Sequence, residues 1–122
     1  MASLPQSRPR VAIYARSATW SQYPGEDPLA RQERACRAYA TAQGYAVAED
    51  HVYHEIMPGT GRAPHPGLDA AIAAVGRGEL AGIVTATPDR LSRNPARLAR
   101  VEREVQQAGG RIEYAQEDPR WQ

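Results

Sequence analysis

Short apolar stretches alternate with helical stretches along the chain, and this order is the feature that most limits how it can fold. Residues 10–16 read Arg-Val-Ala-Ile-Tyr-Ala-Arg, an apolar run typical of a buried strand. Further strands are predicted at 45–48 with 51–54, at 81–86 and at 111–115. Helices are predicted at 28–44, from 66 to about 76, and at 95–107. This alternation predicts an α/β fold with a mostly parallel four-stranded sheet flanked by helices.

Turn-forming residues mark the ends of these elements. Asp27 followed by Pro28 is typical of a helix start, and Gly44 is typical of a helix end. The segment 55–66 is dense in glycine and proline, so we expect a loop there, beginning at Glu55.

The length of 122 residues suits one domain, which we place at 10–116, between a flexible N-terminus at 1–9 and a polar tail at 117–122. No apolar run approaches the roughly 20 residues that span a bilayer, and no signal peptide is recognisable, so we expect a cytoplasmic protein without membrane contact. Cys36 has no partner for a disulfide and is expected to be buried. The scattered histidines do not suggest a metal site, and we expect no cofactor.

The net charge of +1 does not by itself indicate a nucleic-acid-binding protein. All 15 basic residues are arginine, a side chain suited to bidentate phosphate contacts. The base composition of the source genome would also account for this bias.

Charged residues follow three of the predicted strands: Arg16, Glu55, and the run from Asp89 through Arg90 to Arg93. The carboxyl ends of parallel strands share one edge of the sheet, where ligands bind. We therefore expect a cluster of arginines able to hold a phosphodiester, with Asp89 and Glu55 supplying counter-charge. The alternative is that these are solvated charges in loops.

The same residues resemble the catalytic domain of serine site-specific recombinases, the resolvase/invertase family, over about residues 10–116. The resemblance is carried by Tyr14-Ala-Arg16, by Gln22 and Gln32, by the loop from Gly59 to Pro66-Gly67-Leu68, and above all by Asp89-Arg90-Leu91-Ser92-Arg93. An apparent insertion lies at 23–28. The order and spacing of the motifs together make the resemblance specific.

The resemblance implies phosphoryl transfer in which a serine hydroxyl attacks DNA and forms a phosphoserine link. Arg16, Arg90 and Arg93 would bind the scissile phosphate, since this chemistry depends on positioning and positive charge. Asp89 would orient them. Tyr14, Gln22, Gln32 and Glu55 would support the site.

One departure from the family pattern concerns the nucleophile itself. The pattern Tyr-x-Arg-x-Ser places the serine two residues after Arg16, where this chain has Ala18. Ser17 and Thr19 flank that position. Side chains alternate between faces along an extended strand, so Ser17 is expected to point away from the side of Arg16 unless a bulge turns it.

Two further departures concern charged positions of the site. His65 stands where the family usually has arginine, which lowers the fixed positive charge, and Glu55 stands where aspartate is usual, a change that keeps the charge. The chain also stops before the long dimerisation helix and the DNA-recognition module of the family, so we expect DNA binding to be weak or to depend on a partner. That partner would be a second copy or a full-length recombinase.

Three functions follow from these observations. The first is a resolvase-like domain of DNA recombination that is deficient in cleavage because of Ala18. The second is an active recombinase or nickase that uses Ser17 or Thr19. The third is a module that binds nucleic acid, another phosphate-bearing partner or a recombinase without chemistry. Trp20 could stack on a base or a partner protein, but we expect it to cover the end of the sheet.

Overall fold

The computed structural model describes residues 8–17, 27–56 and 65–116. Four strands form one sheet in the order β2-β1-β3-β4: β1 (Arg10–Ser17), β2 (Ala46–Ile56), β3 (Gly82–Thr85) and β4 (Arg111–Tyr114). Three α-helices and one short 3-10 helix connect them: α1 (Pro28–Gln43), α2 (Pro66–Gly76), η1 (Pro88–Arg90) and α3 (Pro95–Gln107). Every strand pair is parallel, so the predicted α/β fold with a four-stranded sheet is confirmed.

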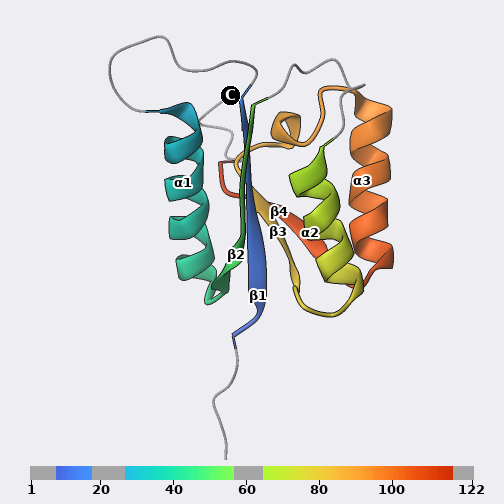
Figure 1. Cartoon of the computed structure of the whole chain (residues 1–122), viewed down its shortest axis with the longest axis horizontal. Helices are drawn as coiled ribbons and strands as arrows, with labels where there is room; N and C mark the ends of the chain where they lie inside the picture. The colour runs from blue at the N-terminus through green and yellow to red at the C-terminus, as the bar shows by residue number, and fades with distance from the viewer. Residues whose placement is uncertain (1–7, 18–26, 57–64, 117–122) are drawn as a thin grey trace, which may run out of the picture.

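The helices cover both faces of the sheet, with α1 on one face and α2 and α3 on the other (Figure 1). Alternation along β1 builds a core on each side: Val11 and Ile13 pack toward α1, while Ala12 and Tyr14 pack toward α2 and α3. A strand buried on both faces explains why the first apolar run has no charged member between Val11 and Ala15.

The helix ends follow the predicted signals. The Asp27 side chain accepts a hydrogen bond from the Leu29 amide at 3.0 Å. Asn94, which was not singled out from the sequence, accepts from the Ala96 and Arg97 amides at the start of α3. Gly44 ends α1 with a φ of 80°, a backbone conformation that glycine adopts without a steric penalty.

The predicted loop over residues 55–66 is wrong at its start. β2 continues through Glu55 to Ile56, because Arg16 and Ser17 of β1 pair with these two residues in register. The second predicted strand, expected from residues 45–48 with 51–54, is β2, and its pairing with β1 shifts register between Val11 and Ile13.

Several predicted features lie outside the described residues: Ala18, Thr19, Trp20, Gln22 and the Gly59 loop. The same holds for the tail at 117–122 and most of the N-terminus at 1–9. The domain boundaries therefore stay predictions. Within the described part of the chain, no helix is long and apolar enough to cross a membrane.

Candidate phosphate-binding site

Arg16 is the centre of the polar groups at the carboxyl edge of the sheet. It ends the buried part of β1 and is only 2% exposed. Its Nε donates a hydrogen bond to the Arg90 carbonyl oxygen at 2.9 Å, and its Nη2 donates to the Asp89 carbonyl oxygen at 2.7 Å. These bonds hold η1, which follows β3, against the end of β1.

The electrostatic surroundings of Arg16 include two other arginines of the predicted cluster. Burial lowers the pKa of Arg16, and the positive charges of Arg90 and Arg93 lower it further, whereas Tyr14 and Asp89 act in the opposite direction. Three guanidinium groups are therefore close enough to repel one another. Such a group gains stability from a bound anion.

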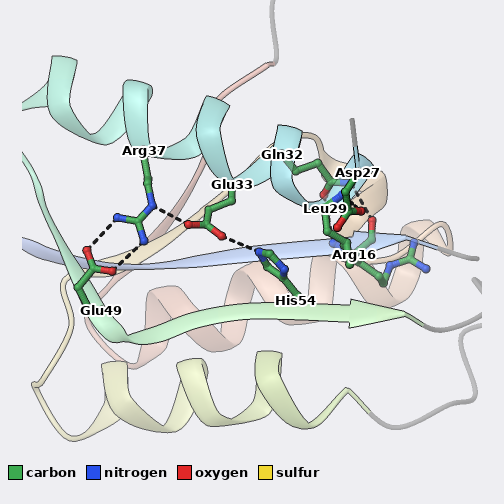
Figure 2. A network of polar contacts seen from close by, with 8 residues as sticks. All are labelled: Arg16, Asp27, Leu29, Gln32, Glu33, Arg37, Glu49 and His54. Carbon is green, nitrogen blue, oxygen red and sulfur yellow. Dashed lines mark hydrogen bonds and ion pairs between the residues drawn. The ribbon is translucent and has the colours of Figure 1, made fainter. Parts of the chain in front are cut away.

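Gln32 of α1 holds the backbone of Arg16 from the α1 face of the sheet. Its Oε1 accepts from the Arg16 amide at 3.1 Å, and its Nε2 donates to the Arg16 carbonyl oxygen at 3.0 Å (Figure 2). Arg90 donates to that same carbonyl oxygen through Nη1 at 3.3 Å. Gln32 thus connects α1 to the end of β1, which gives the predicted supporting residue a geometric role.

Asp89 contacts Arg16 differently from the expected orienting carboxylate. The oxygen bonded to Arg16 is the Asp89 backbone carbonyl, while its carboxylate accepts a hydrogen bond from the Thr87 hydroxyl. The carboxylate still contributes charge, because it raises the pKa of Arg16.

Glu55 pairs with uncharged groups rather than with the arginines. Its Oε1 accepts a hydrogen bond from the Tyr14 hydroxyl at 2.6 Å, and its Oε2 accepts from the Gly67 amide. A Cβ at Gly67 would lie 2.7 Å from Oε2, so the close approach of α2 to this carboxylate requires glycine. The expectation that Glu55 supplies counter-charge to the arginines is not supported by these contacts.

Tyr14 remains a protonated hydrogen-bond donor in this network. Burial and the hydrogen bond to Glu55 raise its pKa far above its ordinary value, and Thr85 donates to the Tyr14 carbonyl oxygen at 2.8 Å. Tyr14 therefore ties β1 to β2 through its side chain and to β3 through its backbone.

His65, predicted from the sequence to stand where the resembled family has arginine, is buried, with 4% exposed. Its Nδ1 lies 3.4 Å from the Tyr14 hydroxyl. Burial lowers the pKa of His65, and the charge of Arg97 lowers it further. The side chain therefore favours the neutral form, so it does not replace the charge of an arginine.

Ser17 is the one candidate substitute nucleophile within the described residues, since Thr19 lies outside them. It is the last residue of β1 and is partly buried. Because side chains alternate along β1, Ser17 belongs to the α1 face of the sheet and Arg16 to the α2 and α3 face.

A cleft of about 120 Å³ opens on the α1 side of this edge. It is lined by Pro28, Arg31, Gln32, Arg90 and Gln116. Arg31 was not predicted from the sequence as a site residue, although its position next to Gln32 at the start of α1 could have indicated it. Arg93 is exposed beside this region, whereas Arg90 is half-buried.

The remaining reactive side chains have structural partners. Cys36 is fully buried, and burial raises the pKa of its thiol to about 12, as expected for a core residue. His51 contacts the Tyr53 hydroxyl at 2.7 Å, and His54 contacts Glu33 at 2.7 Å. No group of three or more metal-ligating side chains is found in the described parts of the chain.

Comparison with solved structures places this geometry among recombinase catalytic domains. The C-terminal catalytic domain of ISC1926 TnpA, an IS607-like serine recombinase, is 28% identical over 91% of this chain and 72% of its own, with a TM-score of 0.73. The corresponding domain of IS1535 TnpA, also IS607-like, is 27% identical over 86% of this chain and 70% of its own, with a TM-score of 0.66.

The N-terminal catalytic domain of TP901-1 integrase shares the fold, with a TM-score of 0.75 over 88% of this chain and 79% of its own at 21% identity. No curated protein matches the chain. The model of the family described as "Resolvase, N terminal domain" matches residues 11–121, nearly the whole sequence. The chain therefore belongs to the resolvase N-terminal domain family and is a resolvase-like serine recombinase domain.

Proposed function

We propose that this domain binds DNA backbone phosphates through Arg16, Arg90 and Arg93 and that it is deficient in strand cleavage. The observation that carries the proposal is the buried Arg16 guanidinium, which two carbonyl oxygens orient at the carboxyl edge of the sheet. A site whose donors are fixed before the ligand arrives stabilises the charge of a phosphoryl group without reorganisation.

Each arginine contributes in a different way. Arg16 is buried and held by two carbonyl oxygens, while Arg90 lies across the end of β1 with one nitrogen on the Arg16 carbonyl. Arg93 is exposed and is the member best placed for first contact with DNA. Tyr14, Glu55 and Gln32 act as positioning residues, because their hydrogen bonds hold the strand ends that present the arginines.

Cleavage would require a hydroxyl oxygen to bond to phosphorus while the bond from phosphorus to a deoxyribose oxygen breaks and that oxygen takes up a proton. Ala18, at the position of the family serine, has no atom that can form the new bond. A neutral His65 in place of an arginine also lowers the charge available to the transition state. Both differences favour binding over chemistry.

A second candidate function is strand cleavage by Ser17. It is favoured by the position of this residue on the α1 side of β1, the side on which the cleft with Arg90 opens. In this case both the nucleophile and the bound phosphate would lie on the α1 face of the sheet, opposite to the face of the Arg16 side chain.

Binding is tested by measuring the affinity for a mixed-sequence DNA duplex at several salt concentrations. Arg90→Ala and Arg93→Ala are each expected to weaken binding and to reduce the slope of log affinity against log salt by about 0.9, the value for one lost phosphate contact. Arg103→Ala removes the same charge from the exposed face of α3 and serves as the control. Equal behaviour of all three variants would contradict the proposal.

Cleavage is tested by incubating the protein with a library of random-sequence duplexes and searching for a protein–DNA adduct that survives denaturation. We expect no adduct with the natural sequence and an adduct with Ala18→Ser. An adduct that disappears in Ser17→Ala or Thr19→Ala would instead establish the second function.

The biological setting we propose is association with a second copy or with a full-length recombinase that supplies sequence recognition. Sedimentation of the domain alone, with DNA, and with a complete recombinase distinguishes these two partners. A monomer that joins neither would contradict this part of the proposal.

A further inference from the structure

The cleft on the α1 side of the site is lined by two arginines, Arg31 and Arg90, and two glutamines, Gln32 and Gln116. Among the described residues, no acidic side chain lines it. About 120 Å³ is open within it, whereas roughly 10–15 Å³ of such space holds one water molecule. The cleft therefore has room for a phosphate group, and the charged side chains that line it within the described parts of the chain are both arginines.

Both arginines have unused hydrogen-bonding capacity. Among the residues that the structure describes, the Arg31 side chain has no carboxylate or hydrogen-bond partner, and Arg90 Nε is buried without one. Buried polar atoms are rarely left unpaired, so Arg90 Nε is a polar atom whose hydrogen bond the described residues do not supply.

The start of α1 adds to this positive potential. Unpaired amide groups give a helix N-terminus a partial positive charge, which acidic residues normally offset. The first turn of α1 contains none, although Asp27 caps the Leu29 amide, and Arg31 follows directly. Arg31 adds to the positive potential at this end of the helix, and the Asp27 carboxylate offsets part of it.

We propose that this cleft binds a second phosphate group of the DNA backbone and that Arg31 is a phosphate-binding residue of the domain. The inference rests on the proposed function, because it places this phosphate next to the one held by Arg16. It extends the binding site across the end of β1 to the α1 face.

The experiment compares Arg31→Ala with Arg103→Ala in two titrations. In the first, duplex DNA is added at several salt concentrations, and Arg90→Ala reports on the proposed function. In the second, inorganic phosphate is added against chloride at equal ionic strength while arginine Nε–H resonances are followed by NMR. The natural sequence should show a saturable phosphate shift for Arg31, and Arg31→Ala should bind DNA about fivefold more weakly, with a salt slope smaller by about 0.9.

The outcomes separate this inference from the proposed function. If Arg90→Ala weakens DNA binding while Arg31→Ala behaves like Arg103→Ala in both titrations, the cleft proposal is overturned and the proposed function stands. If neither Arg90→Ala nor Arg31→Ala affects DNA binding, the proposed function fails. A phosphate shift at Arg31 would then support the cleft as a site for free phosphate, and its absence would overturn the cleft as well.

Discussion

Arg37, within α1, and Arg16, near the end of β1, lie in contrasting environments (Figure 2). Arg37 donates to Glu33 at 2.7 Å and to both oxygens of Glu49 at 2.8 Å, and these hydrogen bonds raise its pKa. Arg16 donates to the carbonyl oxygens of Asp89 and Arg90, and burial lowers its pKa.

This contrast distinguishes the structural arginines of the fold from the arginines of the site. Carboxylates orient Arg37 and also neutralise it, whereas carbonyl oxygens orient Arg16 and carry no net charge. Arg77 and Arg111 follow the pattern of Arg37, since they pair with Glu79 and Glu113. Bonds to carbonyls keep a fixed positive charge at the carboxyl edge of the sheet, where a phosphate would need it.

The largest expected effect is from Arg16→Ala. It removes a buried group and leaves two carbonyl oxygens without their donors, which should lower the free energy of unfolding by about 2–4 kcal/mol. Urea unfolding measures the change. If Arg16→Ala lowers the free energy of unfolding as little as Arg37→Ala does, the contrast between the two arginines is wrong, because the carbonyl contacts would then not hold η1.

Tyr14→Phe should come next. It removes the hydroxyl that donates to Glu55 at 2.6 Å and should cost about 1–2 kcal/mol in the same urea experiment. Tyr39→Phe is the matched control, since Tyr39 donates to Glu113 at 2.6 Å outside the site. Only Tyr14→Phe should also weaken DNA binding; if both variants weaken it equally, Tyr14 has no specific role in positioning the site.

A smaller effect concerns pH and His65. Its pKa is lower in the folded protein than its ordinary value of 6.5, so below about pH 6.5 the unfolded chain binds more protons and the free energy of unfolding falls as the pH drops. His65→Gln should therefore lose less stability between pH 7 and pH 5 than the natural sequence. Parallel stability curves would show that His65 titrates normally in the folded state.

The smallest effect is expected for Arg37→Ala. Its side chain is 37% exposed, and exposed ion pairs are weakened by solvent and salt. The thermal midpoint should change by less than about 2 °C, and added salt should reduce even this difference. A larger loss of thermal stability that does not depend on salt would show that the contacts of Arg37 with Glu33 and Glu49 are as important for stability as the site.

The sequence predicted the fold well, because each element carries its own signal. The apolar run of β1, the Asp27 cap and the Gly44 helix end are all local features, and the elements that they mark were confirmed. Glu55 was wrongly predicted in a loop, because its place in β2 depends on pairing with Arg16, a contact between distant segments.

The site was less accessible to prediction, because its main contacts involve backbone groups. The order of charged residues after the strands predicted that Arg16 and Arg90 would approach each other. It did not reveal that carbonyl oxygens would orient Arg16, since every residue has a carbonyl. Arg31 was missed for a related reason, because the cleft that gives it a role forms only when η1 packs beside α1.

The central claim is that the carboxyl-edge arginines bind a DNA phosphate, and a crystal structure of the domain with a short DNA duplex tests it most directly. The account predicts a backbone phosphate within hydrogen-bonding distance of the Arg90 and Arg93 guanidinium groups. DNA seated on exposed arginines of α3, such as Arg100 and Arg103, with no phosphate at the carboxyl edge, would contradict it.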